Sequence, residues 1–153
     1  MSLITAYLTP KQEQIWNLKS KGLQEVSIAR KLNVTRQTVH KALDVAHSKI
    51  LQALEEAAKL NKIKVETVDP TKGILIGYIP EFRTKAIVTF SSVNGVQIWY
   101  KYEGDCKNCD QLQACRTMLL NELEERKIQP IRNLDTMLPS KLAEILFSKI
   151  VGE

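Results

Sequence analysis

The chain has 153 residues, of which 44% are hydrophobic and 25% are charged, close to the average for globular proteins. This composition excludes a disordered tail, a fibrous repeat and, because no apolar run approaches roughly 20 residues, a membrane-spanning helix. The first six residues lack the basic start and the apolar stretch of a signal peptide, so we expect a soluble cytoplasmic protein without a membrane partner.

The formal net charge of +5 is distributed unevenly along the chain. Residues 1–62 contain 10 Lys and Arg against 5 Asp and Glu, a balance of +5, whereas residues 63–153 contain 12 of each kind. A basic segment joined to a neutral one favours a module that binds a polyanion, followed by a part with another role. A solvated helical surface would produce the same charge, so the charge alone leaves both interpretations open.

Residues 1–62 are predicted to form three helices, because apolar residues recur there at helical spacing. The first helix begins behind the cap Thr9 and ends at Gly22. The second covers about residues 24–32. Thr35 caps a third helix, in which neither Gly nor Pro occurs over residues 36–60.

The second and third helices have the spacing of a helix-turn-helix, in which two helices cross at a large angle over a short turn. Such a crossing requires a small residue where the helices touch and an apolar residue in the turn, as Ala29 and Val34 provide. Val39 and Leu43 are expected on the inner face of the third helix. The candidate DNA-binding residues are the polar ones at or near its exposed start: Thr35, Arg36, Gln37, Thr38, His40 and Lys41.

This region also carries a family resemblance. Residues 22–39 read GLQEVSIARKLNVTRQTV, similar to the pattern G-(L/Y)-x-x-x-x-I-A-x-x-L-x-V-(S/T)-x-x-T-V of LuxR-type regulators and of the promoter-reading region of sigma factors. The opening Leu8-Thr9-Pro10-Lys11-Gln12 is similar to the start of such modules. A helix-turn-helix followed by a small extra domain resembles archaeal Tfx-type regulators. The resemblance implies that the candidate residues lie on a recognition helix, about residues 35–47, which enters the major groove of double-stranded DNA.

After residue 62 the chain becomes rich in Val, Ile, Tyr and Thr and is divided by turn signals. Four strands are expected, at about residues 63–68, 74–78, 86–91 and 96–102, with Asn94-Gly95 as a good hairpin signal. Helical spacing returns at residues 112–127 and 139–151. We therefore expect an α+β fold. It comprises a three-helix helix-turn-helix domain with a long third helix over residues 1–62, and a four-stranded sheet domain with C-terminal helices over residues 63–153.

The third helix carries an approximate a/d seam, formed by Val39, Leu43, Ala46, Ile50, Leu54 and Ala57. Its first half is needed for the core of its own module, whereas its second half could pack on the sheet domain or on a second copy. Because most soluble oligomers are two-fold dimers and a dimer doubles the DNA contacts, we expect a homodimer. His40, Asp44 and His47 share one face of this helix, as a polar surface or as metal ligands.

All three cysteines lie in one segment, as Cys106, Cys109 and Cys115. The spacing C-x2-C-x5-C in a cytoplasmic chain points to metal or redox chemistry, with zinc or an iron–sulfur cluster as the candidate cofactor. A fourth ligand would have to be Asp105, Asp110, a partner-chain group or water. A disulfide with one remaining thiol, and packing without function, are the alternatives. At a helix start, Cys115 is expected to have a lowered pKa.

The sheet region contains none of the familiar nucleotide-binding, hydrolase or metalloprotease motifs, so we expect no enzyme. The sequence instead predicts a dimeric, sequence-specific DNA-binding transcription regulator. Its second domain would assemble the protein or respond to a small-molecule or metal effector. The alternatives are an enzyme that acts on nucleic acid and a protein-binding adaptor, each targeted by the helix-turn-helix.

Overall fold

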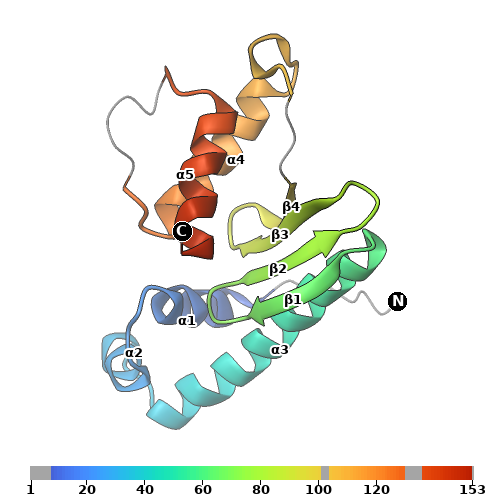
Figure 1. Ribbon diagram of the computed structural model, residues 1–153. Helices are drawn as coiled ribbons and strands as arrows, with labels where there is room; N and C mark the ends of the chain where they lie inside the picture. The colour runs from blue at the N-terminus through green and yellow to red at the C-terminus, as the bar shows by residue number, and fades with distance from the viewer. Residues whose placement is uncertain (1–7, 101–103, 130–135, 153) are drawn as a thin grey trace. The chain divides into compact units, whose positions relative to one another are not determined.

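In the computed structural model, residues 8–100, 104–129 and 136–152 are described, and the chain divides into two compact units, Met1–Lys101 and Tyr102–Glu153. The first unit contains α1 (Pro10–Ser20), α2 (Glu25–Leu32), α3 (Arg36–Leu60), β1 (Lys64–Asp69), β2 (Ile74–Ile79), β3 (Thr84–Ser91) and β4 (Gly95–Tyr100) (Figure 1). The second contains the short 3-10 helix η1 (Cys106–Asn108), α4 (Leu112–Glu125) and α5 (Pro139–Val151). The predicted α+β fold, with its order of helices and strands, is confirmed.

The helix starts follow from capping residues. The Thr9 hydroxyl accepts the backbone N–H of Gln12 at 3.2 Å, and the Gln12 side chain accepts the Thr9 N–H at 3.1 Å, which closes a capping box at α1. The Thr35 hydroxyl accepts the backbone N–H of Thr38 at 3.1 Å and so caps α3. Between α2 and α3, Asn33 has φ 54°, a left-handed conformation that asparagine tolerates well. Both predicted caps are therefore confirmed.

The four strands form an antiparallel sheet in the order β1-β2-β3-β4, so each strand pairs with its neighbour along the chain. Ser91 pairs with Gly95 at the β3–β4 turn, where Gly95 has φ +71°, a value that favours glycine. The register shifts between Val65 and Thr67, so β1 carries an irregularity at the edge of the sheet. The strand predictions are confirmed to within two residues, except that residues 101–102 of the last one lie outside the described part of the chain.

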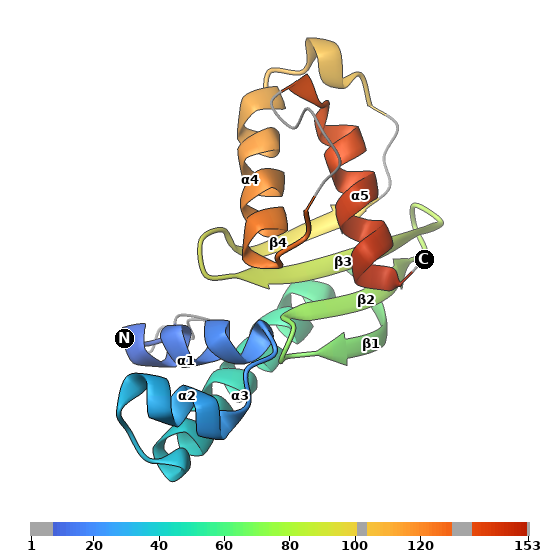
Figure 2. The same cartoon turned by 90° about the vertical axis from the view of Figure 1, so that its left-hand side faces the viewer.

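Helix α3 belongs to two hydrophobic cores. Its first half contributes Val39 and Leu43 to a core shared with α1 and α2. Its second half runs along one face of the sheet (Figure 1 and Figure 2) and forms a second core with that face and with Trp16 of α1. The α3 members of this second core are each at most 1% exposed: Ala46, Ile50, Leu54 and Ala58.

Of the apolar seam predicted for α3, five of the six residues are therefore buried within their own chain, and the sixth, Ala57, is partly buried beside the buried Ala58. Of the two partners expected for its second half, the structure shows the sheet, which leaves this surface unavailable to a second copy. The expected domain boundary after residue 62 falls inside the first compact unit, because α3 and the sheet share a core.

Side chains of α1 attach it to one end of the sheet. Trp16 Nε1 donates a hydrogen bond to the carbonyl oxygen of Pro70, in the β1–β2 turn, at 3.0 Å. The Trp16 ring meets the Phe90 ring edge-on, with centroids 5.1 Å apart. Asn17 Nδ2 donates to the hydroxyl of Ser92, in the β3–β4 turn, at 3.3 Å. Helix α1 and the sheet are thus linked by polar contacts as well as by the core that they share with α3.

The second unit is built on a pair of helices, α4 and α5, which lie side by side (Figure 2). The leucines between them are at most 2% exposed: Leu119, Leu123, Leu142 and Leu146. Glu122 of α4 is fully buried and forms an ion pair with Arg126 Nε at 3.0 Å, which offsets the cost of burying its charge. Within the described part of the chain, no helix combines the length and the apolar character that crossing a membrane requires.

Replacement of Leu54 tests the second core. Leu54→Ala should lower the free energy of unfolding by about 2–5 kcal/mol, because it leaves a cavity between α3 and the sheet. Leu60, in the same helix, is 84% exposed, whereas Leu54 is 0% exposed. Leu60→Ala should therefore change the free energy of unfolding by less than about 0.5 kcal/mol. Urea denaturation followed by circular dichroism measures both, and equal losses would contradict the packing of α3 on the sheet.

Candidate nucleic-acid interface

The helix-turn-helix arrangement of α2 and α3 is held by a small core of its own. Ala29 is 6% exposed and packs in this core with Val39 and Leu43, which are 0% and 2% exposed. Val34, in the turn, packs against the same core, and its backbone N–H donates to the Ala29 carbonyl at 3.0 Å. The burial of Ala29, Val39 and Leu43 is confirmed, and Val34 is partly buried against them. Because the inner face of α3 is buried, its outer face at this end is left to solvent.

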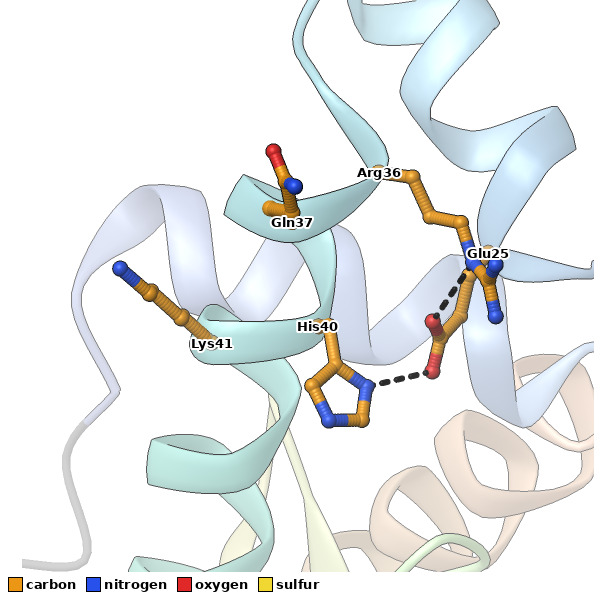
Figure 3. A pocket seen from close by; sticks show the side chains of 5 residues that line it. All are labelled: Glu25, Arg36, Gln37, His40 and Lys41. Atoms are coloured by element: carbon orange, nitrogen blue, oxygen red, sulfur yellow. Dashed lines mark hydrogen bonds and ion pairs between the residues drawn. The ribbon is translucent and has the colours of Figure 1, made fainter.

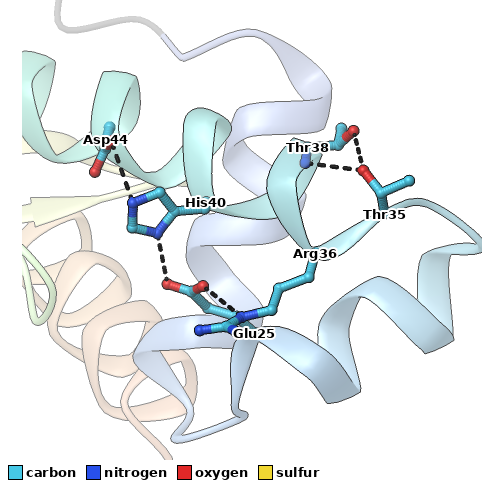
Figure 4. Close-up of polar contacts among 6 residues, drawn as sticks. All are labelled: Glu25, Thr35, Arg36, Thr38, His40 and Asp44. Atoms are coloured by element: carbon cyan, nitrogen blue, oxygen red, sulfur yellow. Dashed lines mark hydrogen bonds and ion pairs between the residues drawn. The ribbon is translucent and has the colours of Figure 1, made fainter.

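All six candidate DNA-binding residues are exposed, at the cap or in the first two turns of α3. The hydroxyls of Thr35 and Thr38 lie 2.8 Å apart and share a hydrogen bond (Figure 4), so both take part in closing the helix start. Gln37 and Lys41, one turn apart, point away from Glu25 of α2 (Figure 3). The structure thus divides the six residues into three pairs. Thr35 and Thr38 cap the helix, Gln37 and Lys41 point outward, and Arg36 and His40 face α2.

A pocket of about 550 Å³ lies at this place, lined by Glu25, Arg36, Gln37, His40 and Lys41 (Figure 3). Its lining combines cationic groups, an amide and an imidazole with one carboxylate. Guanidinium and amide groups can form paired hydrogen bonds with base edges, and the ammonium group suits a phosphate. The pocket therefore carries the donors and acceptors that a nucleic-acid surface requires.

Glu25 is the centre of a charged network that the sequence did not reveal. Its Oε2 lies 3.6 Å from Arg36 Nε, and its Oε1 lies 3.2 Å from His40 Nδ1 (Figure 4). His40 Nε2 in turn lies 3.6 Å from Asp44 Oδ2. The only sequence signal for Glu25 is its place in the first turn of α2, where an acidic residue is common for reasons of the helix dipole. No regular spacing connects it with Arg36 on another helix.

The environment of Glu25 favours its ionised form. The hydrogen bond with His40 is the main cause that lowers the pKa of Glu25; the positive charges of His40, Arg36 and Lys19 act in the same direction, and partial burial opposes them. Because the pKa is lowered in the folded state, the stability that this network contributes is present above the ordinary value of 4.5 and is lost as the pH falls through the lowered pKa. Glu25 is therefore a carboxylate at neutral pH.

His47 does not join His40 and Asp44 on the exposed face of α3. It is half-buried, and its Nε2 atom is buried without a hydrogen-bond partner among the described residues. Burial is the main cause that lowers the pKa of His47, against the raising effect of the nearby carboxylates of Asp44 and Asp69. The three residues predicted to share one face therefore divide into an exposed pair, His40 and Asp44, and a half-buried imidazole.

The three cysteines lie in the second unit as free thiols: Cys106 in η1, Cys109 after it and Cys115 in the first turns of α4. Burial, together with the nearby Cys106 and Cys109, raises the pKa of Cys115, so the expected lowering was wrong. The physical reason is that burial disfavours the charged thiolate. The Cys115 N–H already donates to the Gln111 carbonyl at 2.9 Å, so it is not one of the free N–H groups at the helix start.

A metal site was predicted for Cys106, Cys109 and Cys115, with zinc or an iron–sulfur cluster as cofactor. Over residues 8–100, 104–129 and 136–152, no group of three or more His, Cys, Asp or Glu side chains is arranged to hold a metal ion. The three thiols are close enough to affect the pKa of Cys115 without being placed as ligands. The cofactor stays a prediction that the described geometry does not support.

No protein-family profile, no curated protein and no solved structure matches the chain. The resemblance to LuxR-type, sigma-factor and Tfx-type modules therefore stays a prediction from residues 8–12 and 22–39. Function has to be inferred from the residues and contacts of this chain.

The half-buried imidazole of His47 predicts that the stability of the fold depends on pH. Because the pKa of His47 is below its ordinary value of 6.5, the unfolded chain binds the proton more readily, and the free energy of unfolding falls as the pH drops through and below 6.5. His47→Gln should remove this part of the decrease between about pH 7.5 and about pH 5.5. Urea denaturation of wild type and variant at both pH values measures the difference. Parallel pH profiles would show that His47 does not titrate differently in the folded state.

The cysteines should differ in reactivity. Cys109 is exposed, whereas Cys115 is partly buried with a raised pKa, so less of Cys115 is present as the reactive thiolate. Timed alkylation with iodoacetamide near pH 8 should modify Cys109 before Cys115. Mass spectrometry of the labelled peptides gives both rates, and unfolding in urea should remove the difference. Equal rates in the folded protein would contradict the placement of Cys115.

Proposed function

We propose that the protein is a sequence-specific DNA-binding transcription regulator that places the first turns of α3 in the major groove of double-stranded DNA. The observation that supports this most strongly is the combination at the start of α3. Its inner residues Val39 and Leu43 are buried, while six polar residues suited to bases and phosphates are exposed there. In helix-turn-helix proteins, the beginning of the second helix of the motif is the part that contacts base edges.

The charge around this surface fits a nucleic-acid partner. Arg30 and Lys31, in the last turn of α2, and Lys41 of α3 are all exposed. Cations of this kind bind phosphates in a manner independent of sequence and position the module on the duplex. We assign Arg36 and Gln37 to base edges, because their side chains can make paired hydrogen bonds with guanine and adenine.

The proposal includes a homodimer, in which two recognition helices bind two half-sites one turn of DNA apart. The second half of α3 packs on the sheet, so the interface of such a dimer would use another surface. The second unit, with its cysteine segment, would serve assembly or the response to a small-molecule or metal effector.

Substitutions on α3 test this assignment in the full chain. On the preferred site, found by selection from a random DNA library, Arg36→Ala and Gln37→Ala should each weaken binding by about 1–3 kcal/mol, with a smaller loss on random DNA. Lys41→Ala should weaken binding to both DNAs alike and reduce the slope of log affinity against log salt by about 1. Fluorescence anisotropy at several salt concentrations measures these effects.

The matched control is Lys59→Ala, since Lys59 is an exposed lysine in the last turn of the same helix. It removes the same charge far from the proposed interface and should leave affinity nearly unchanged. A wild-type chain that selects no sequence, or a larger effect at Lys59 than at Lys41, would contradict the proposal.

A further inference from the structure

The candidate interface contains an acidic residue, Glu25, although a negative charge there weakens the attraction to DNA phosphates. Glu25 shares its two carboxylate oxygens between two neighbours on α3, with Oε2 directed to Arg36 Nε at 3.6 Å and Oε1 to His40 Nδ1 at 3.2 Å (Figure 4). The ion pair with Arg36 is made through Nε, the inner nitrogen of the guanidinium. The two terminal nitrogens of Arg36 extend beyond Nε (Figure 3). The contact between Nε and Glu25 restricts the directions in which these nitrogens can point.

Burial differs between the two members of this ion pair. The Glu25 side chain is 21% exposed, whereas that of Arg36 is 72% exposed. A long, exposed arginine samples many rotamers, and ordering it on binding costs free energy. A half-buried carboxylate at the start of α2, which His40 keeps ionised, restricts Arg36 before DNA arrives. The contact therefore has the properties of a preorganising interaction.

Asp44 is an acidic residue near His40 that forms no ion pair with Arg36, so it serves as the comparison for Glu25. It is 69% exposed, lies on the same side of α3 and touches His40 Nε2 at 3.6 Å. Both carboxylates flank the same imidazole, but Glu25 alone of the two is paired with Arg36. A purely electrostatic role would make these two acids equivalent, and a positioning role would make them different.

We propose that Glu25 is the positioning residue that holds the guanidinium of Arg36 for recognition of one base pair, so that specificity at that pair depends on an acid that does not itself contact DNA. The inference rests on the proposed function and extends it to a residue outside the recognition helix. Arg36 reads the base edge with its terminal nitrogens, and Glu25 on α2 fixes the direction from which they approach.

The test compares full-length variants on the selected site and on all of its single base-pair substitutions. Arg36→Ala first identifies the base pair at which discrimination depends on Arg36. Discrimination is the ratio of the affinity for the selected site to the affinity for the site with that base pair replaced. Glu25→Gln should lower this ratio at the Arg36-dependent pair to roughly a third of the wild-type ratio or less, and it should leave the ratios at the other pairs unchanged. Asp44→Asn also removes one negative charge, but it should leave discrimination at the Arg36-dependent pair unchanged. Both neutral variants should bind random DNA somewhat more tightly, because each removes a negative charge near the phosphates.

A double substitution separates positioning from other roles. In the Arg36→Ala background, Glu25→Gln should have no further effect on discrimination at the pair, because the group it positions is gone. Glu25→Asp keeps the charge but shortens the side chain, so it should lose discrimination without gaining affinity for random DNA. It also gives a second variant if Glu25→Gln fails to fold, which thermal unfolding would show.

The outcomes distinguish the two proposals. Unchanged discrimination in both Glu25 variants, a uniform loss at every base pair, or an equal loss in Asp44→Asn would overturn the positioning role while leaving DNA binding intact. If Arg36→Ala affects no base pair although the wild-type chain selects a sequence, the positioning role is also overturned. A wild-type chain without sequence preference overturns the proposed function itself.

Discussion

The first unit depends on one helix that is buried by different partners along its length. Val39 and Leu43 join α3 to α1 and α2, whereas Ile50 and Leu54 join it to the sheet. The helix has 25 residues, about 37 Å at 1.5 Å per residue, and no Gly or Pro interrupts it. A stiff element of this kind cannot move at one end without disturbing the core at the other. The exposed start of α3 is therefore held in place by packing some turns away from it.

The charges at that start are not those of a simple polyanion-binding surface. Two carboxylates, those of Glu25 and Asp44, flank His40 among the basic residues. Acids at an interface reduce attraction to phosphates on every DNA sequence alike. If base contacts are kept, the ratio of specific to non-specific affinity rises even though the affinity itself falls. For the proposed DNA-binding function, a net charge of +5 with acids close to the proposed base-contacting residues is thus consistent with selectivity rather than with maximal affinity.

Features set by local sequence could be predicted, and features set by long-range packing could not. The caps at Thr9 and Thr35 and the β3–β4 hairpin depend on neighbouring residues, so short motifs are sufficient to find them. The network around Glu25 depends on how two helices cross, which no spacing along the chain encodes. The apolar seam of α3 does not identify the partner of its second half for a similar reason, since the same spacing of apolar residues suits a sheet and a second copy. For Cys115, the sequence showed a helix start but not the burial that raises its pKa.

The attachment of α1 to the sheet makes the two ends of the sheet unequal. Trp16 and Asn17 reach the turns at Pro70 and Ser92, both at the same end, so a change in length of either turn would displace α1. At the opposite end, the β2–β3 turn contacts the short segment between α3 and β1 through the exposed Lys62–Glu81 ion pair, a contact of small energetic weight. Evolutionary variation in loop length should therefore accumulate in the β2–β3 turn. The same turn is the natural place to graft a tag or a fused domain without disturbing the helices at the other end.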